Sequence, residues 1–415
     1  MAPAATFVII GAGLAGAKAC EALRERGFDG RVVLLGDERH RPYERPALSK
    51  DYLTGKSERE QLFVHPAAWY TDHDIDLRTG HEATAIDRTS RRVTLADGDH
   101  VGYDRLLLAT GSSPRRLPVP GGDAEGVHYL RRVEDSDRIK DTLAASARIV
   151  VVGGGWIGLE VAAAARQAGV EVVVVETAAL PLLGVLGPEA AQVFAGLHRD
   201  HGVDLRTGTQ VGAITIDGAG RATGVRLAAG SGGGLIEADA VVVGVGATPN
   251  TRLAAAAGLS IEDGVVVDAT LATSDPAICA AGDIARADHP VLGTRVRVEH
   301  WANALNQPAT AAATMLGEHA TYDRLPYFFS DQYDLGMEYT GHVVPGGYDR
   351  VVFRGDVDAR EFVAFWCRQD RVLAGMNVNV WGVADQIKAL IGSGRAVDPG
   401  RLADPGQPLE ELGLG

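Results

Sequence analysis

The sequence predicts an α/β protein with two similar parallel-sheet units, followed by a smaller α+β domain at the C-terminal end. The main observation is an internal duplication. One unit opens with FVIIGAGLAG and closes with LLLATGSSPR, and the other opens with IVVVGGGWIG and closes with VVVGVGATPN. Each opening is typical of a buried strand that is followed by a glycine turn and an alanine-rich helix. Each closing is typical of another buried strand, which glycine and proline end. After about residue 326 the chain becomes aromatic-rich and alternating, which indicates a separate α+β domain.

The first glycine turn consists of Gly11, Gly13 and Gly16, between a strand and a helix that we expect to end at Gly27. The next strand, RVVLLGDE, supplies Asp37 at about the 20-residue distance typical of dinucleotide-binding folds. Such a turn lets the backbone approach a pyrophosphate at a helix N-terminus, and the carboxylate can bind a ribose hydroxyl. The first unit is therefore predicted to be a Rossmann-like dinucleotide-binding domain.

The second glycine turn has the same features. Gly153, Gly155 and Gly158 precede a helix, and Glu176 ends the strand VEVVVVE. A glutamate there can accept hydrogen bonds from the ribose 2′ and 3′ hydroxyls and would repel a 2′-phosphate. The residues TAA follow, with no arginine to bind that phosphate. The second unit is therefore predicted to bind NADH rather than NADPH.

The chain returns to a strand, glycine and helix pattern over residues 265–320. ICAAGDIA places Gly282 and Asp283 at the carboxyl end of a strand, and a helix follows near Asn303. The positive N-terminal end of that helix suits the negative charge of a reduced flavin ring. The second domain is thus an insertion in the first. The predicted domains are 1–114 with 247–325 for FAD, 115–246 for NAD, and 326–415 for the α+β domain.

Composition excludes several classes of protein. With 46% hydrophobic and 23% charged residues, the chain is typical of globular proteins. No apolar run approaches the ~20 residues that span a bilayer, and the start, MAPAATFVIIGAG, lacks the basic segment of a signal peptide. The net charge of −14 argues against nucleic acid and anionic membranes as partners. We therefore expect a cytoplasmic protein.

The cysteines Cys20, Cys279 and Cys367 lie far apart in the sequence. They form no CxxC and no metal-ligand spacing, so neither a disulfide framework nor an intrinsic metal site is expected. The sequence instead predicts three isolated thiols in apolar surroundings. The loop RPYERPALSK, residues 41–50, contains no cysteine at all.

The motifs GAGLAG, RPYERPALSK, LLLATGSSPR, GGGWIGLE, GATPN, AAGD and EHWANALNQ resemble those of the bacterial NADH-dependent ferredoxin reductases. These FAD-containing enzymes serve oxygenases and cytochromes P450, and apoptosis-inducing factor is a more distant relative. The resemblance runs from about residue 6 to the C-terminus. It implies a glutathione-reductase-like architecture, FAD and NADH as cofactors, and a ferredoxin, [2Fe–2S] or similar, as electron acceptor.

The resemblance also implies site residues. Lys50 would pair with Glu160 beside the reactive flavin nitrogen, and these are the predicted catalytic residues. The chain has only five lysines among its 40 basic residues, which favours a specific role for Lys50 over that of a surface lysine. The predicted FAD contacts are Gly11, Gly13, Ala15, Gly16, Asp37, Arg45, Lys50, Ala83, Arg131, Asp283 and Trp301. Further predicted cofactor-binding residues are Ala109, Thr110, Gly111, Gly153, Gly155, Ile157, Gly158, Glu176, Gly246 and Gly282.

Related disulfide reductases pass the electron pair of their flavin to cysteines, which the loop at residues 41–50 lacks. We therefore expect hydride to arrive from NADH and single electrons to leave to an external ferredoxin. Two alternatives remain. One is an NADH oxidase, or a quinone, dye or monodehydroascorbate reductase that admits small acceptors. The other is a flavin-binding, NADH-sensing interaction protein that resembles apoptosis-inducing factor.

The sequence departs from the family pattern at three positions. Leu180 and Gly184 stand where relatives commonly place arginines that face the NADH phosphates. Each loss removes a charge-assisted bond of roughly 1.5–3 kcal/mol, which predicts weak NADH binding. Phe329 stands where several relatives have a tryptophan over the flavin, and it is either a stacking ring or an ordinary core aromatic. The α+β domain is expected to form either a homodimer interface or a partner site.

Overall fold

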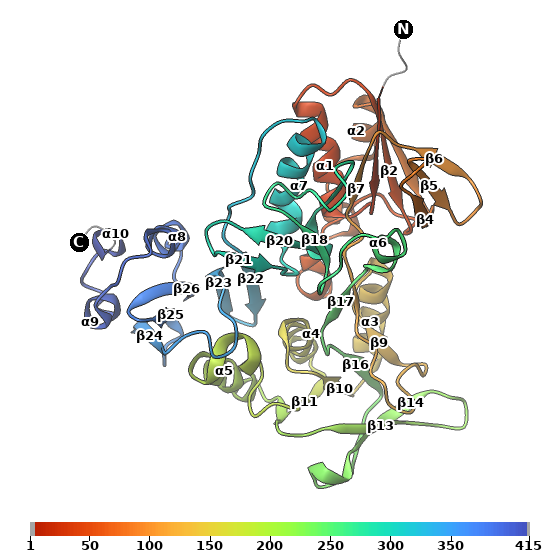
Figure 1. Ribbon diagram of the computed structural model, residues 1–415. Helices are drawn as coiled ribbons and strands as arrows, with labels where there is room; N and C mark the ends of the chain where they lie inside the picture. The colour runs from red at the N-terminus through yellow and green to blue at the C-terminus, as the bar shows by residue number, and fades with distance from the viewer. Residues whose placement is uncertain (1–4, 413–415) are drawn as a thin grey trace. The chain divides into compact units, whose positions relative to one another are not determined.

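The computed structural model describes residues 5–412 and contains two compact units (Figure 1). Unit 1 consists of the described part of Met1–Glu44 together with Arg59–Ser113 and Thr248–Tyr327. Unit 2 consists of Arg45–Glu58, Pro114–Ala247 and the described part of Phe328–Gly415. The expectations for the first four and last three residues, which concern the start of the chain and the end of the α+β domain, lie outside the described residues. The residue limits of the three predicted domains remain a prediction.

Unit 1 is built on a parallel five-stranded sheet in the order β19-β7-β1-β2-β3. The strands β1, β2 and β7 are short and mostly apolar, which is typical of a sheet covered on both faces. The residue opposite Ile10 is Leu35 on one side and Leu108 on the other, so the carboxyl ends of three strands are level. The strand bounds are β1 Thr6–Ile10, β2 Arg31–Gly36, β3 Ile75–Thr79, β7 Arg105–Leu108 and β19 Ile278–Ala280.

Two alanine-rich helices, α1 and α7, lie side by side in unit 1 and pack on this sheet (Figure 1). Their small side chains let the two helices approach closely. Smaller elements complete the unit. The bounds are α1 Leu14–Glu25, α2 Ala67–Asp72, α6 Arg252–Ala256, α7 Trp301–Met315, β4 Ala83–Asp87, β5 Arg92–Leu95, β6 His100–Gly102, β18 Val265–Val267, β20 Ala285–His289 and β21 Thr294–Val296, with 3-10 helices η2 Arg59–Leu62 and η4 Gly282–Ile284.

Unit 2 repeats this topology with a parallel sheet in the order β12-β11-β10-β16-β9. Its central strand β10 is flanked by β11 and β16, as β1 is flanked by β2 and β7. The bounds are β9 Val127–Tyr129, α3 Val133–Ala145, β10 Arg148–Val152, α4 Trp156–Gln167, β11 Glu171–Val175, β12 Asp204–Arg206, β13 Val211–Ile216, β14 Ala222–Leu227, β15 Leu235–Glu237 and β16 Ala240–Val243, with 3-10 helices η1 Pro46–Ser49 and η3 Ala229–Ser231. The short strands β8 Ser112–Pro114 and β17 Ala247–Pro249 stand where the chain passes between the units. The duplication seen in the sequence is thus a duplication of fold.

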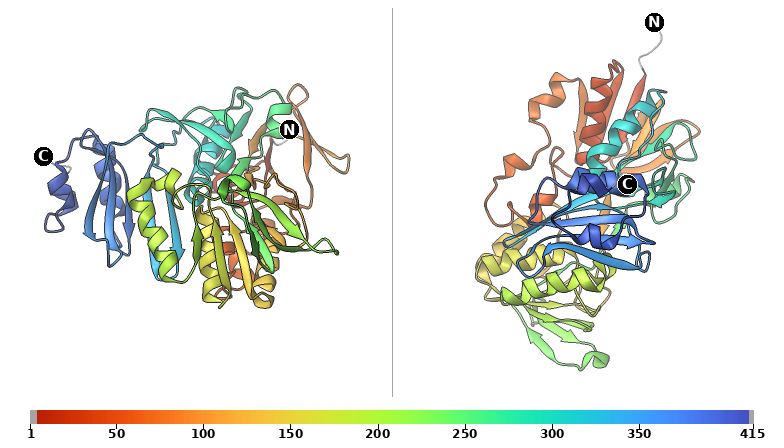
Figure 2. Two further views of the ribbon diagram at one scale, coloured as in Figure 1. Left: turned by 90° about the horizontal axis from the view of Figure 1, so that it is seen from below. Right: turned by 90° about the vertical axis from the view of Figure 1, so that its left-hand side faces the viewer.

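The C-terminal part forms a five-stranded sheet in the order β22-β23-β26-β25-β24. Alternation along β26 turns Ala374 and Met376 toward α5 and turns Gly375 toward Ile387 of α8. The sheet therefore lies between α5 and the three last helices (Figure 2, left). The bounds are α5 Leu183–Asp200, β22 Tyr327–Gln332, β23 Leu335–Gly341, β24 Arg350–Asp356, β25 Glu361–Arg368, β26 Arg371–Val378, α8 Ala384–Ser393, α9 Pro399–Ala403 and α10 Leu409–Leu412.

Candidate functional site

In the first glycine turn, Gly11 and Gly16 pack closely against backbone atoms, whereas Gly13 has open space beside it. Gly11 has φ +118°, and a Cβ atom there would lie 2.1 Å from the carbonyl oxygen of Ala109, so only glycine fits. A Cβ atom on Gly16 would lie 2.1 Å from the carbonyl oxygen of Gly11. Gly13, which precedes α1, has no atom within 4 Å of such a position. The turn thus presents free backbone surface at a helix N-terminus, where a phosphate can be bound.

The second glycine turn has the same shape. Gly153 has φ +104°, and its Cβ position would lie 2.4 Å from the carbonyl oxygen of Gly244. A Cβ atom on Gly158 would lie 2.2 Å from the carbonyl oxygen of Gly153. At Gly155, which precedes α4, the nearest atom would be 3.7 Å away. Each sheet therefore carries a glycine turn of the same shape before a helix, and phosphate binding at the two turns stays a prediction.

A carboxylate follows the neighbouring strand in both units. Asp37 is exposed and comes directly after β2. Glu176 comes directly after β11, and its two carboxylate oxygens accept hydrogen bonds from the backbone nitrogens of Gly154 (2.6 Å) and Ala178 (2.7 Å). These bonds hold Glu176 at the edge of the second glycine turn, where a nucleotide ribose would lie.

The carboxyl edge of the unit 1 sheet brings together residues from distant parts of the sequence. Asp283 accepts a hydrogen bond of 2.8 Å from the hydroxyl of Ser112. Gly282 has φ +79°, and its backbone nitrogen donates to Oε1 of the buried Gln307 at 2.7 Å. A Cβ atom on Gly282 would lie 3.3 Å from the Cβ of Ala15. Sequence reasoning missed Ser112 and Gln307, although Ser112 lies within the motif LLLATGSSPR and Gln307 ends the motif EHWANALNQ.

Several other predicted contacts have defined positions. The side chain of Asn250 donates to the carbonyl oxygen of Thr110 at 2.8 Å in unit 1. The indole nitrogen of Trp301, the first residue of α7, donates to Glu44 at 2.9 Å, also in unit 1. In unit 2, the guanidinium of Arg45 donates to the carbonyl oxygen of Arg131. The remaining predicted residues are Ala83 on β4, Gly111 after β7, Ile157 exposed on the first turn of α4, and Gly246 with φ +102°.

Lys50 and Glu160 form a buried ion pair in unit 2. The distance between Lys50 Nζ and Glu160 Oε1 is 2.8 Å, and the two side chains are 11% and 5% exposed. Lys50 directly follows the 3-10 helix η1, and Glu160 lies on α4. The carboxylate accepts two further hydrogen bonds, from the hydroxyls of Ser49 (2.5 Å) and Ser330 (2.7 Å). A buried charge is tolerated when it is paired and its remaining lone pairs are satisfied, and this pair meets both conditions.

Two groups on β22 adjoin the ion pair. The ring centroid of Phe329 lies 5.5 Å from Lys50 Nζ, so this ring, which stands where several relatives have a tryptophan, lies beside the predicted catalytic pair. Burial raises the pKa of Asp331; Lys50 opposes that shift and Glu160 adds to it. The ion pair therefore belongs to a larger charged group on loop Arg45–Glu58, α4 and β22.

The three cysteines are free and buried. Burial raises the pKa of Cys279 to about 12 and that of Cys367 to about 11, and it raises the pKa of Cys20 as well. A thiol reacts as its thiolate, so these side chains are inert near neutral pH. This agrees with the prediction of three isolated thiols.

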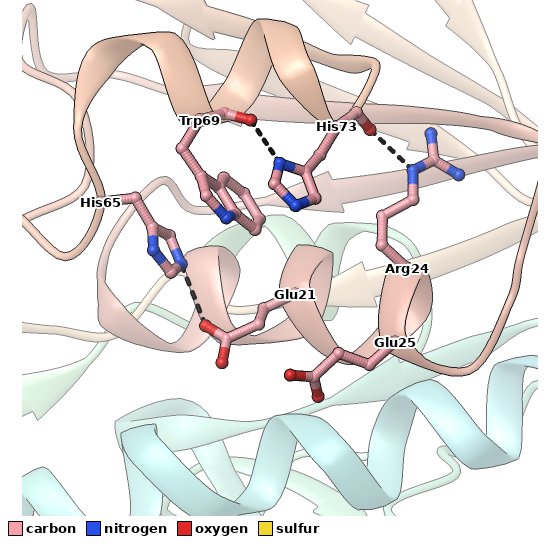
Figure 3. Close-up of a pocket in the computed structure, with 6 residues that line it drawn as sticks. All are labelled: Glu21, Arg24, Glu25, His65, Trp69 and His73. Carbon is pink, nitrogen blue, oxygen red and sulfur yellow. Dashed lines mark hydrogen bonds and ion pairs between the residues drawn. The ribbon is translucent and has the colours of Figure 1, made fainter.

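A separate pocket of about 330 Å³ lies in unit 1 beside α1 and α2 (Figure 3). The ring of Trp69 lies between those of His65 and His73, at centroid distances of 3.9 Å and 4.3 Å. The guanidinium of Arg24 donates to backbone carbonyl groups, including that of His73 at 2.8 Å, so its charge is already satisfied. The pocket contains none of the predicted site residues.

Within residues 5–412, no group of three or more histidine, cysteine, aspartate or glutamate side chains could hold a metal ion. No helix in the same range is long and apolar enough to cross a bilayer.

Comparison with known proteins decides the family. Residues 5–308 match the family described as pyridine nucleotide-disulphide oxidoreductase, and residues 327–413 match the family described as reductase C-terminal. The chain belongs to the pyridine nucleotide-disulphide oxidoreductase family. As a member of that family it is an oxidoreductase, and the family implies FAD and NAD(H) as cofactors, as predicted from the sequence.

Similar members of this oxidoreductase family are ferredoxin reductases. The chain is 40% identical to putidaredoxin reductase of Pseudomonas putida, over 98% of this chain and 96% of that protein. It is 42% identical to the ferredoxin–NAD(+) reductase component of the anthranilate 1,2-dioxygenase system of Burkholderia cepacia, over 96% of this chain and 97% of that protein. The resemblance to NADH-dependent ferredoxin reductases is therefore confirmed.

Solved structures of the family agree with the fold. The putidaredoxin reductase in a covalent complex with putidaredoxin matches with a TM-score of 0.94 at 40% identity, over 99% of this chain and 98% of that chain. The ferredoxin reductase for the CYP199A2 system of Rhodopseudomonas palustris matches with a TM-score of 0.93 at 37% identity, over 98% of this chain and 99% of that chain. The predicted architecture, two Rossmann-like domains and a C-terminal α+β domain, is confirmed.

Proposed function

We propose that this oxidoreductase takes hydride from NADH and passes single electrons to a ferredoxin-type iron–sulfur protein that serves a cytochrome P450 or another oxygenase. The observation that carries the proposal is the pair of open glycine turns, each with its own carboxylate, in a chain whose cysteines are buried. Two turns fit two dinucleotides. Buried thiols leave an external carrier as the recipient of the electrons. The relatives that are ferredoxin reductases of oxygenase systems support this choice.

The residues of unit 1 fit FAD. The backbone of the first glycine turn and the N-terminus of α1 would hold the pyrophosphate, and Asp37 would bind the adenosine ribose. Asp283, held by Ser112, would bind the sugar-alcohol part, and the N-terminus of α7 would face negative charge on the ring. When bound, FAD supplies the ability to accept two electrons as hydride and to release them one at a time. Ala83, Ala109, Thr110, Gly111 and Trp301 are proposed as further contacts.

The residues of unit 2 fit NADH. The second glycine turn, with Ile157, and the N-terminus of α4 would hold its pyrophosphate, and Glu176 would accept hydrogen bonds from its adenosine ribose. The carboxylate would repel the 2′-phosphate of NADPH. Gly246, which has φ +102° and lies between β16 and β17, is proposed as a further contact. We therefore propose NADH as the electron donor.

Lys50 and Glu160 are proposed as the catalytic pair, with Arg45 and Arg131 as further flavin contacts. Glu160 holds the ammonium of Lys50 at a fixed position, and this cation would interact with the bound cofactor without carrying electrons itself. Such a pair would orient the reacting ring and tune its electronics. We also propose the domain limits predicted from the sequence, a cytoplasmic location in a bacterium, and a C-terminal domain that forms either a homodimer interface or a partner site.

Anaerobic mixing of the FAD-loaded protein with NADH tests the proposal. NADH should bleach the flavin absorbance, NADPH should do so much more slowly, and cytochrome c should be reduced rapidly only when a ferredoxin is added. Fast turnover with oxygen or quinone without a carrier would instead favour the oxidase or quinone reductase alternative. Very slow reduction with a long-lived charge-transfer complex and a changed oligomeric state would favour the NADH-sensing alternative.

A further inference from the structure

A chain of buried hydrogen bonds leads through unit 2 and ends on Glu160. Its members are His198 on α5 and Ser330 and Gln332 on β22, which are 0%, 1% and 1% exposed. Residues two apart on a strand share a face, so Ser330 and Gln332 point the same way and Asp331 points the other way. Polar groups this deeply buried are costly unless each has a partner. Each of these side chains has one.

The hydrogen-bond partners fix the direction of the chain. The carboxylate of Glu160 can only accept, so the hydroxyl of Ser330, 2.7 Å away, donates its single proton to it. The lone pairs of that hydroxyl then accept from the Gln332 amide nitrogen at 3.1 Å. The Gln332 amide oxygen therefore faces His198, whose Nε2 lies 2.8 Å away. The proton of the imidazole must be on Nε2.

The outer end of the chain agrees with this assignment. The hydroxyl of Tyr333 lies 3.3 Å from His198 Nδ1, which carries the free lone pair of the ring and accepts the bond. Burial lowers the pKa of His198 to about 4, so the ring is neutral near pH 7, as the chain requires. Tyr333 has φ +57°, an uncommon conformation for a bulky residue, and its ring stacks on that of His201 at 3.8 Å. Strained backbone of this kind persists only where its surroundings hold it.

All four donors thus point toward Glu160, in the order Tyr333, His198, Gln332, Ser330. Hydrogen bonds aligned in one direction polarise one another, and a bond to a charged acceptor is about twice as strong as a neutral one. The chain ends on the same oxygen, Oε1, that Lys50 contacts. The hydrogen-bond chain therefore restrains the carboxylate that forms the ion pair with Lys50.

We propose that Ser330, Gln332 and His198 are positioning residues that keep the carboxylate of Glu160 aimed at Lys50. The strand β22 of the C-terminal part thereby takes part in setting the geometry of the proposed catalytic pair. Without the chain, Glu160 would retain Lys50 and Ser49 but could rotate away from its present orientation. This inference rests on the proposed function, because it assigns the chain a role in hydride transfer from NADH.

The first test needs no cofactor turnover. With histidine labelled by ¹⁵N, the ring nitrogens of His198 report their protonation directly, and the signal is assigned by its loss in His198→Gln. We expect a neutral ring with its proton on Nε2, protected from solvent exchange. A proton on Nδ1, or a charged ring at neutral pH, would overturn the proposal. In Gln332→Met the protection of that proton should be lost.

The second test compares hydroxyl removal inside and outside the chain. Ser330→Ala removes the donor to Glu160, and Ser330→Thr keeps it. The matched control is Thr142→Val, because Thr142 also forms a hydroxyl–histidine contact in unit 2, 3.0 Å from His128, without belonging to the chain. Loss of one hydrogen bond to a charged group should slow single-turnover flavin reduction by NADH about tenfold in Ser330→Ala. Ser330→Thr and Thr142→Val should react like the wild type, with KM for NADH unchanged in all three.

The outcomes separate the two proposals. If NADH fails to reduce the flavin of the wild-type protein, the proposed function is wrong, while the histidine measurement still decides whether the chain exists. If the wild type is reduced and Ser330→Ala matches Thr142→Val, the positioning role is wrong and the proposed function stands. Should Ser330→Ala fail to fold, Gln332→Met takes its place, since it breaks the same chain one bond further from Glu160. A wild-type rate of flavin reduction in that variant would equally overturn the role.

Discussion

The carboxylate of Glu176 lies 2.6 Å from the backbone nitrogen of Gly154, so the end of β11 is tied to the glycine turn that follows β10. The other carboxylate oxygen accepts from the backbone nitrogen of Ala178 at 2.7 Å. A bound ribose would therefore meet a carboxylate that is already oriented, which reduces the conformational cost of binding.

Replacement of Glu176 should reduce the preference for NADH. Glu176→Ala removes the proposed hydrogen bonds from the ribose hydroxyls to the charged carboxylate. Each such bond contributes about 1.5–3 kcal/mol, so kcat/KM for NADH should fall about 10- to 100-fold. The value for NADPH should fall less or rise, because the repulsion of its 2′-phosphate is gone. Glu171→Ala is the control, since Glu171 is exposed at the opposite end of the same strand. An unchanged NADH/NADPH ratio in Glu176→Ala would remove this residue from the site.

Lys50→Ala should both destabilise the protein and alter the bound flavin. The change leaves the carboxylate of Glu160 buried without its cation, which typically costs about 3–5 kcal/mol. Chemical denaturation measures this loss, and the flavin spectrum and potential report the site. Lys388→Ala is the control, because its ion pair with Asp385 is exposed to solvent and such pairs contribute little to stability. Adding Glu160→Gln to Lys50→Ala should restore stability but not the rate of flavin reduction. A Lys50→Ala protein with wild-type stability, spectrum and rates would refute the assignment.

Gly184→Arg should strengthen NADH binding. Gly184 is exposed, and a Cβ atom there would have no neighbour within 4 Å, so the arginine can be accommodated without strain. A charge-assisted bond to a phosphate of about 1.5–3 kcal/mol would lower KM for NADH about tenfold or more. Gly184→Gln supplies similar length without charge and should have little effect. If KM of the wild type is already in the low micromolar range, the missing arginines at Leu180 and Gly184 do not weaken binding.

Substitutions in the two glycine turns should each affect the binding of a different cofactor. Gly13 and Gly155 have open space at the Cβ position and no positive φ, so alanine at either should leave the folding stability of the protein unchanged. A methyl group there would still obstruct the approach of a pyrophosphate. Gly13→Ala should therefore weaken FAD retention while Gly155→Ala raises KM for NADH, and neither should do the reverse. Gly11→Ala should instead destabilise the protein itself, by about 1–3 kcal/mol, as an unfolding midpoint would show.

Thiol reagents should not affect the native enzyme. The pKa values of Cys367 and Cys279, about 11 and about 12, lie above the working range, and thiolate forms only as pH rises toward them. Iodoacetamide near pH 7.5 should therefore leave the rate of flavin reduction unchanged, and mass spectrometry should find alkylation only after unfolding. Rapid inactivation that tracks the labelling of one cysteine would indicate a sulfur relay in the polypeptide.

The fold was largely predictable because its signals are local. The glycine turns, their strands and the acidic residues after β2 and β11 each occupy a short stretch of sequence. The Lys50–Glu160 pair followed from family resemblance, since nothing in the spacing of these residues implies contact. Ser330 and Gln332 were missed for a physical reason. Their positions two residues apart on β22 indicate a shared face, but the partners on α4 and α5 come from segments more than 130 residues away.

The path of the chain between the two units has a consequence for protein engineering. The chain changes unit after residues 44, 58, 113, 247 and 327, so neither unit can be produced as one uninterrupted fragment free of the other. Only the last crossing permits a simple chimera, in which residues 328–415 come from a relative. Such a graft would bring a foreign Ser330 and Gln332 to the host's own Glu160 and His198. Hybrid reductases made at this junction should therefore work best when donor and host agree at those four positions.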